Sequence, residues 1–122
     1  MWEKEIWIAK RISIEQDEYG NDIERFDKPK KYMFNYQPIS GSLKLQDYGE
    51  NNDDMFRAYV DKAYYLGKIK RGDRVYLEDD ETLVSDLVKL VRNDNEFCQN
   101  ANYVVKSALP QNLKLKLDFV KR

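Results

Sequence analysis

Hydrophobic and polar residues alternate through most of this 122-residue chain, a pattern typical of β-strands with one buried face. The alternation is clearest near the C-terminus, where polar side chains separate four apolar ones: Leu113, Leu115, Leu117 and Phe119. Pro110-Gln111-Asn112 lies between this run and the apolar segment "NYVVKSAL" and predicts a turn. We therefore expect the two segments to form a C-terminal hairpin.

A second hairpin is predicted near the N-terminus. Four isoleucines share one parity, with an interruption at Lys10: Ile6, Ile8, Ile12 and Ile14. The segment "QDEYGND" follows them, and its Gly20-Asn21 pair is a strong turn signal. We expect the first two strands to form a hairpin around this turn.

Two further candidate strands lie in the middle of the chain. In "KKYMFNYQPIS" and "MFRAYVDKAYYL", apolar side chains again share one parity: Tyr32, Phe34 and Tyr36 in the first, Phe56, Ala58 and Val60 in the second. Pro38 predicts that the first strand ends at a sheet edge or a bend. Residues 40–55 hold few apolar side chains, and a connection this long in a small barrel is usually functional or disordered.

Arg71-Gly72-Asp73 is a tripeptide that adhesion proteins display on exposed loops. Short motifs carry a high false-positive risk without supporting context, and the opening "MWEKEIWIAK" does not resemble a secretory signal. Gly72-Asp73 supplies turn chemistry directly before "RVYLE", where Val75 and Leu77 alternate with polar neighbours as in a half-buried strand. We interpret the tripeptide as a turn that leads into this strand.

One segment departs from strand periodicity. In "DDETLVSDLVKLVRND", apolar residues recur at the spacing of an amphipathic helix. Acidic residues stand at its start and basic ones near its end, as the helix dipole favours. We expect a helix over about residues 82–92, with a stripe of Leu83, Leu87 and Leu90 packed against the body of the protein.

Five or six short strands with one helix predict a mainly β protein. The expected architecture is a small β-barrel or sandwich that carries a helical insertion at about residues 79–102. No linker, repeat or low-complexity segment divides the chain, so we expect residues 1–122 to form a single domain. The 42% apolar and 35% charged composition is too apolar for a disordered protein.

Charge and cysteine content narrow the function classes. The 21 basic and 22 acidic residues give a net charge of −1, so any nucleic-acid contact requires a local basic strip. Cys98 is the only cysteine, which excludes an internal disulfide and gives no sign of an oxidising compartment. No apolar run reaches membrane-spanning length, and we expect the chain to fold in the cytosol without membrane contact.

Residues with catalytic or metal-binding potential are scarce. The chain has no histidine, which removes the commonest general base and leaves Cys98 without an activating partner. Gly20 stands at the wrong position for an EF-hand loop, and the other acidic clusters lack spaced ligands. We expect no catalytic residue, no metal and no cofactor. The nine tyrosines suit strands and also interfaces, which favours an assembly module over an enzyme.

Three stretches combine turns and strands in a distinctive order. The first, "RISIEQDEYGNDIERF", has an Asp-x-x-Gly turn at Asp17 to Gly20 between two strands. The second, "YMFNYQPISGS", leads into a Pro-x-Ser-Gly step, and the third, "IKRGDRVYLED", contains a turn and strand with Gly72, Arg74 and Val75. In this order, with the final hairpin in the closing position, they resemble the head-tail joining proteins of tailed bacteriophages, also described as head-closure, connector or stopper proteins.

The resemblance implies a fold, a role and a place. The fold is a small SH3-like β-barrel with a long loop at about residues 40–55; the helix within 79–102 departs from the family, which usually has a short turn or hairpin there. The role is that of a structural virion protein of the neck, not an enzyme. It forms a homo-oligomeric ring between portal or adaptor proteins and tail-completion or tail-tube proteins, after assembly in the host cytoplasm. The ring closes the DNA-filled head, and DNA passes through its centre without sequence-specific contact.

The resemblance also implies that the long loop reaches a neighbouring subunit or the central channel. Its candidate residues are Leu43, Leu45, Tyr48, Gly49, Glu50, Asp53 and Asp54. The leucines would anchor the base of the loop and Tyr48-Gly49 would form its tip. The acidic side chains would keep the tip solvated and repel the phosphate groups of passing DNA.

Other classes remain open besides a related tail-completion protein. A small nucleic-acid-binding barrel would present basic residues beside exposed aromatic ones: Lys10, Arg11, Lys114, Lys116, Lys121 and Arg122. Salt-dependent binding of free DNA by the isolated protein would favour this class. An enzyme acting on a small molecule is the weakest alternative, and turnover that survives removal of all bound metal would be needed to support it.

Overall fold

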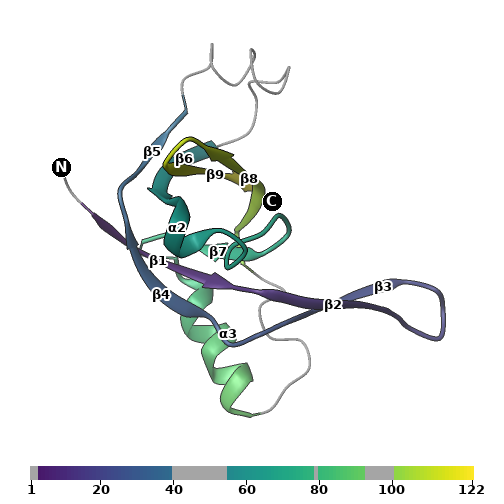
Figure 1. The fold of residues 1–122 in the computed structure, drawn as a ribbon. Helices are drawn as coiled ribbons and strands as arrows, with labels where there is room; N and C mark the ends of the chain where they lie inside the picture. Colours follow the sequence, from purple (N-terminus) through teal and green to yellow (C-terminus); the bar gives the residue numbers. More distant parts are fainter. Residues whose placement is uncertain (1–2, 40–54, 79, 93–100) are drawn as a thin grey trace.

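The computed structural model describes residues 3–39, 55–78, 80–92 and 101–122 (Figure 1). These residues are mainly β, as the alternation predicted. The strands are β1 (Lys4–Ala9), β2 (Arg11–Gln16), β3 (Asp22–Phe26), β4 (Lys30–Phe34), β5 (Tyr36–Pro38), β6 (Met55–Asp61), β7 (Arg74–Tyr76), β8 (Tyr103–Gln111) and β9 (Lys114–Lys121). Two helices accompany them in this part of the chain, the single turn α2 (Lys62–Tyr65) and the longer α3 (Thr82–Val91).

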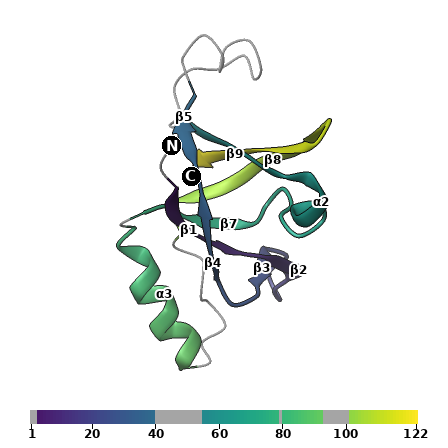
Figure 2. The same cartoon turned by 60° about the vertical axis from the view of Figure 1, so that its left-hand side comes forward.

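Seven strands form one antiparallel sheet in the order β4-β1-β7-β8-β9-β6-β5. The two edge strands, β4 and β5, follow one another in sequence and are separated only by Asn35. Because both edges belong to one continuous segment, the sheet has to curl until its edges approach each other (Figure 1, Figure 2). The curled sheet confirms the predicted class, a mainly β small barrel. Pro38 ends the edge strand β5, where a missing N–H costs the sheet little.

The concave side of the sheet holds the main core. The predicted strand parities are confirmed there in β1, β4, β6 and β9, whereas a register shift between Val105 and Ser107 interrupts the alternation in β8. The buried members are Ile6, Ile8, Phe34, Tyr36, Ala58, Val60, Ile69, Val75, Leu77, Val105, Leu115, Leu117 and Phe119. Each large apolar side chain buried in this way contributes about 1.5–3 kcal/mol to folding.

Strand β7 differs from the prediction of a half-buried strand. Arg74, Val75 and Tyr76 are all buried, because β7 lies between β1 and β8 and both of its faces are covered. Val75 faces the main core, whereas Tyr76 belongs to a second, smaller cluster. That cluster also contains Ala9, Phe26 and Ala101, with Trp7 of β1 and Leu83 of α3 packed against it.

The four isoleucines near the N-terminus that share one parity are divided between two strands with different surroundings. The chain turns away from the large sheet at Lys10: β1 lies inside that sheet, whereas β2 pairs only with β3. Ile12 and Ile14 are therefore 65% and 54% exposed. The predicted turn is confirmed, since the N–H of Gly20 donates to the carbonyl of Asp17 at 3.1 Å. The resulting β2–β3 hairpin projects from the barrel (Figure 1).

The C-terminal hairpin is confirmed, but its turn lies later in the chain than predicted. Pro110 and Gln111 remain in strand β8, and the turn consists of Asn112 and Leu113. Asn112 has a φ of 48°, a conformation that asparagine adopts more readily than most residues. Leu113 is 85% exposed, because it lies in this turn and not on the inward face of β9.

Helix α3 is confirmed, but its leucine stripe is only partly packed. All three leucines are partly buried, and Leu83 packs against the second cluster near the barrel, while the rest of the helix runs away from the barrel (Figure 2). The one buried residue of the helix is Asp86. Its carboxylate accepts a hydrogen bond of 2.6 Å from the hydroxyl of Tyr76, which fixes the start of the helix against the sheet.

Candidate functional site

The predicted contact loop lies outside the described residues, and so do its seven candidate residues: Leu43, Leu45, Tyr48, Gly49, Glu50, Asp53 and Asp54. The described residues on either side of it are Ile39 and Met55, and both are buried. The N–H of Ile39 donates to the carbonyl of Met55 at 3.0 Å. The barrel therefore holds the two ends of the loop side by side.

The six basic residues of the nucleic-acid alternative do not form one strip. Lys114 lines a hollow of about 520 Å³ together with Arg57 and Tyr59. The guanidinium of Arg122 donates to the carbonyl of Ala101 at 2.8 Å. Lys10 lines a different hollow from Lys114.

That second hollow gathers lysines from three separate segments of the chain. It has a volume of about 330 Å³ and lies where β1, β4 and the segment after α2 meet. Its five basic residues, all exposed, are Lys10, Lys28, Lys30, Lys31 and Lys68. We call this surface the lysine hollow. Among the described residues that line it, Asp27 is the single carboxylate, so the hollow favours a negatively charged partner.

Contacts within the lysine hollow bring its segments together. The N–H of Asp27 donates to the carbonyl of Lys10 at 2.8 Å, which ties the β3–β4 connection to the end of β1. The ammonium group of Lys68 lies over the ring of Tyr64, 3.6 Å from the ring centroid. Burial raises the pKa of Tyr32, another lining residue, so its hydroxyl remains a hydrogen-bond donor at neutral pH.

The far end of the β2–β3 hairpin carries the opposite charge. Residues 15–22, which we call the hairpin tip, contain four acidic residues and no basic one: Glu15, Asp17, Glu18 and Asp22. The carboxylate of Asp17 accepts hydrogen bonds from the N–H groups of Asn21 and Tyr19 at 2.9 Å, which shape the turn. The hydrogen bond from Asn21 has the largest effect and lowers the pKa of Asp17, so the tip stays negatively charged. Tyr19 is 81% exposed at its centre.

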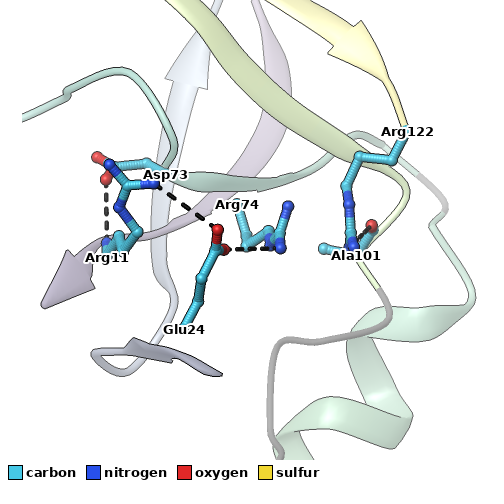
Figure 3. Close-up of polar contacts among 6 residues, drawn as sticks. All are labelled: Arg11, Glu24, Asp73, Arg74, Ala101 and Arg122. Carbon is cyan, nitrogen blue, oxygen red and sulfur yellow. Dashed lines mark hydrogen bonds and ion pairs between the residues drawn. The ribbon is translucent and has the colours of Figure 1, made fainter. Parts of the chain in front are cut away.

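A polar cluster, the clamp, fixes the base of the hairpin against the barrel (Figure 3). Glu24 of β3 accepts a hydrogen bond of 2.8 Å from Arg74 of β7 and lies 3.8 Å from the guanidinium of Arg11. The guanidinium of Arg74 also lies 5.0 Å from the ring centroid of Phe26. Burial, followed by the nearby charge of Arg122, lowers the pKa of Arg74, and Glu24 opposes this shift. The clamp therefore stabilises a buried cation and sets the direction of the hairpin.

The Arg71-Gly72-Asp73 segment belongs to the same region. The buried carboxylate of Asp73 accepts hydrogen bonds of 3.0 Å from the N–H groups of Arg11 and Lys70, and burial raises the pKa of Asp73 despite them. Gly72 has a φ of 94°, and a Cβ added there would lie 2.6 Å from the Arg11 guanidinium. The turn interpretation is confirmed, because an aspartate 1% exposed is inaccessible to an adhesion receptor.

Helix α3 presents an apolar face to solvent. Val84, Leu87, Val88 and Val91, with Arg92, line a shallow groove of about 320 Å³. Val91 is 87% exposed and Val84 is 68% exposed. The exposure of this face was not predicted. Helical periodicity identifies the apolar face of the helix, but it does not report how much of that face the barrel covers.

Among the described residues, no group of histidine, cysteine or acidic side chains is placed to hold a metal ion. Within the same residues, no helix has the length and apolar character needed to cross a membrane. Comparison with known protein families, curated proteins and solved structures finds no match.

The lysine hollow and the clamp were both missed by sequence reasoning. The hollow unites residues that are distant in sequence, and the clamp depends on the path of β2 after it leaves the sheet. One signal was available, since three lysines occur within residues 28–31, directly after the acidic hairpin. Such an abrupt change of charge sign predicts neighbouring surfaces of opposite charge.

Proposed function

We propose that this chain is a structural subunit of the neck of a tailed bacteriophage, forming a ring between the portal or adaptor proteins and the tail. The observation that carries the proposal is a small curled barrel in which strands β2, β3, β5 and β7 lie within the three stretches that carry the resemblance. Gly20 and Gly72 have positive φ values in the turns that the resemblance requires, and Pro38 ends the edge strand.

Exposed apolar side chains on projecting elements support a role within an assembly. The β2–β3 hairpin and α3 extend from the barrel (Figure 1, Figure 2). Ile12 and Ile14 on the first and Val84 on the second are each more than half exposed. Soluble monomers rarely expose contiguous apolar patches, and larger patches usually mark contacts with other proteins.

The barrel would supply a rigid unit for such a ring, and the residue 40–55 loop would supply its contact with the channel. The hydrogen bond between Ile39 and Met55 gives this loop a fixed base. In the assembled neck, the loops of successive subunits would together close the path of the packaged DNA.

The experiment that tests the proposal is disruption of the gene in the phage that carries it. We expect heads that package DNA and then lose it, together with free tails, and full recovery when the wild-type chain is supplied from a plasmid. A chain lacking Gln46 to Asn52 should fold and yet fail to restore the particles. Normal numbers of DNA-filled, tailed particles after disruption would contradict the proposal.

A second candidate function is nucleic-acid binding, and the lysine hollow is the observation that favours it. The aromatic rings there are already engaged, since Tyr32 stacks on Phe34 with centroids 5.4 Å apart and Tyr64 lies under Lys68. Binding would therefore use phosphate contacts, not base stacking, and would weaken steeply with salt. Retention of duplex DNA by the isolated protein at physiological salt, lost in a Lys30→Glu/Lys31→Glu variant, would support this function.

A further inference from the structure

We propose that the hairpin tip of one copy of this chain docks into the lysine hollow of the next copy, so that subunits associate head to tail. The inference rests on the proposed ring function and identifies the contact that would build the ring. The partner is a second copy of the chain because the two complementary surfaces occur on the same molecule.

Charge complementarity is the first observation in favour of this contact. The tip has four acidic residues and no basic one, with Glu15 lying 3.5 Å from the guanidinium of Arg25 in β3, whereas the described lining of the hollow has five lysines and one carboxylate. The net charge of the chain is only −1, so these local concentrations of opposite sign are not opposed by strong repulsion between copies. Complementary patches of this kind set the orientation and specificity of association.

The tip of a hairpin is too far from the hollow of its own chain to neutralise it. Lys10 and Lys28 flank the base of the hairpin, whereas the tip lies at the opposite end of the six-residue strand β2. Six residues of a β-strand extend about 20 Å, which is more than twice the Debye length of about 8 Å at physiological ionic strength. No tip residue lines the hollow of its own chain. Both surfaces therefore remain open to another copy.

The clamp keeps the tip in this outward position. A free two-stranded hairpin is at best marginally stable in water. Here the contacts of Glu24 with Arg74 and Arg11 fix the hairpin base to the barrel, so docking requires little further ordering of the chain.

Apolar groups match as well. Tyr19 is exposed at the centre of the acidic tip, while Ile8, Tyr32 and Tyr64 lie among the lysines of the hollow. A tyrosine surrounded by complementary charges is typical of interface centres, because its ring gains from burial and its hydroxyl keeps a polar partner.

The contact is heterologous, because it joins two different surfaces, the hairpin tip of one copy and the lysine hollow of the next. Such contacts repeat from subunit to subunit and close into a ring when the rotation between subunits allows it. The competing explanation for Lys30 and Lys31 is protection of the edge strand β4 against aggregation. Edge protection does not account for Lys10, Lys28 and Lys68, which lie outside β4.

Two charge-reversed variants test the contact in purified protein. The tip variant is Glu15→Lys/Glu18→Lys/Asp22→Lys, which spares the turn-forming Asp17 and changes the charge of the tip from −4 to +2. The hollow variant is Lys28→Glu/Lys30→Glu/Lys31→Glu, which changes the charge of the described lining from +4 to −2. All six side chains are exposed, so folding should be unaffected. Sedimentation at low salt should show that the wild type forms species larger than a dimer and that each variant alone does not.

A mixture of the two variants is the decisive sample. A positive tip then meets a negative hollow, and a negative tip meets a positive hollow, so alternating subunits should recover association. Lys70→Glu/Lys114→Glu/Lys121→Glu, with three exposed lysines outside the hollow, is the matched control and should associate like the wild type. Failure of the mixture to associate, or association of either variant alone, would overturn the inference.

Carbodiimide coupling locates the contact directly, because it joins a carboxylate to an amine without a spacer. In a mixture of ¹⁴N- and ¹⁵N-labelled wild-type protein, we expect mixed-isotope peptides that link residues 15–22 to residues 28–31 or Lys68. Absence of these inter-chain links at low salt would overturn the inference, and so would association that stops at a dimer. Duplex DNA bound through the hollow, without self-association, would assign the hollow to nucleic acid and also overturn it.

The outcomes separate this inference from the proposed function. If gene disruption abolishes tailed particles while the mixture of charge-reversed variants fails to associate, the neck function is supported and the tip–hollow contact is contradicted. If the mixture associates while gene disruption leaves particles intact, the contact is supported and the neck function is contradicted.

Discussion

The clamp at the base of the hairpin supports a quantitative prediction. Glu24→Ala removes the carboxylate that accepts a hydrogen bond from Arg74, and leaves a guanidinium whose side chain is only 11% exposed without this partner. Since Glu24 is itself 28% exposed, water can replace part of the lost interaction. We expect the free energy of unfolding to fall by about 2 kcal/mol, within the range for hydrogen bonds to charged groups.

A double-mutant cycle separates this interaction from the other contacts of Glu24. Arg74→Met keeps an apolar stem of similar length, and the cycle with Glu24→Ala should give a coupling energy of about 1–2 kcal/mol. The matched cycle with Arg11→Met should give less than about 0.5 kcal/mol, because that pair is 3.8 Å apart and a third exposed.

Urea unfolding followed by the fluorescence of Trp7 measures both cycles, since this residue packs against the second cluster. Amide hydrogen exchange then reports the hairpin itself. In Glu24→Ala, we expect faster exchange in β2 and β3 and unchanged exchange in β9, because only the hairpin depends on the clamp. Equal coupling energies in the two cycles, or unchanged exchange in β2 and β3, would refute the assignment of the clamp to hairpin positioning.

Further predictions concern stability and are measured by the same urea unfolding. Gly72→Val should be destabilised by about 1–3 kcal/mol, because a positive φ is strained for any β-branched residue and the added atoms would meet a guanidinium. Asp73→Glu should cost about 1–3 kcal/mol, because an extra methylene has to fit a buried site. Leu87→Ala should cost less than about 1 kcal/mol, while Leu115→Ala should cost about 2–5 kcal/mol, because only the second leucine is fully buried. Asp118→Ala should cost about 3–5 kcal/mol, because it removes a fully buried carboxylate that accepts two hydrogen bonds from the guanidinium of Arg57.

The alternation of apolar and polar residues was sufficient to predict most strands and the approximate positions of both hairpin turns. The pattern works because each strand of the barrel has one face toward a single core, so side-chain parity and burial coincide. Leu115, Leu117 and Phe119 are fully buried, as their parity predicted. Gly72 was likewise identified as a turn residue from its neighbours alone.

Local patterns could not predict which face another element covers. Arg74 and Tyr76 occupy the polar parity of β7 and are nevertheless buried, because a second cluster and the clamp cover that face. Ile12 and Ile14 continue the parity of β1 and are nevertheless exposed, because β2 leaves the sheet after Lys10. In both cases the outcome depends on pairing between distant segments, which sequence periodicity does not report.

The hairpin tip and the lysine hollow also differ in how far the sequence alone could predict them. The tip is a continuous segment, and its acidic residues and turn were visible in the sequence. The lysine hollow combines Lys10, the lysines at 28–31 and Lys68, which come together only when α2 packs beside β1 and β4. A total charge near zero conceals such a separation of charge, and only the fold reveals it.

Imaging the portal vertex of intact phage particles by electron cryomicroscopy tests the central claim most directly. The account predicts a ring between capsid and tail into which copies of this small barrel fit, each with its β2–β3 hairpin directed at the neighbouring subunit. Density at that position that fits only other chains, in particles from which peptides of this protein are absent, would contradict the account.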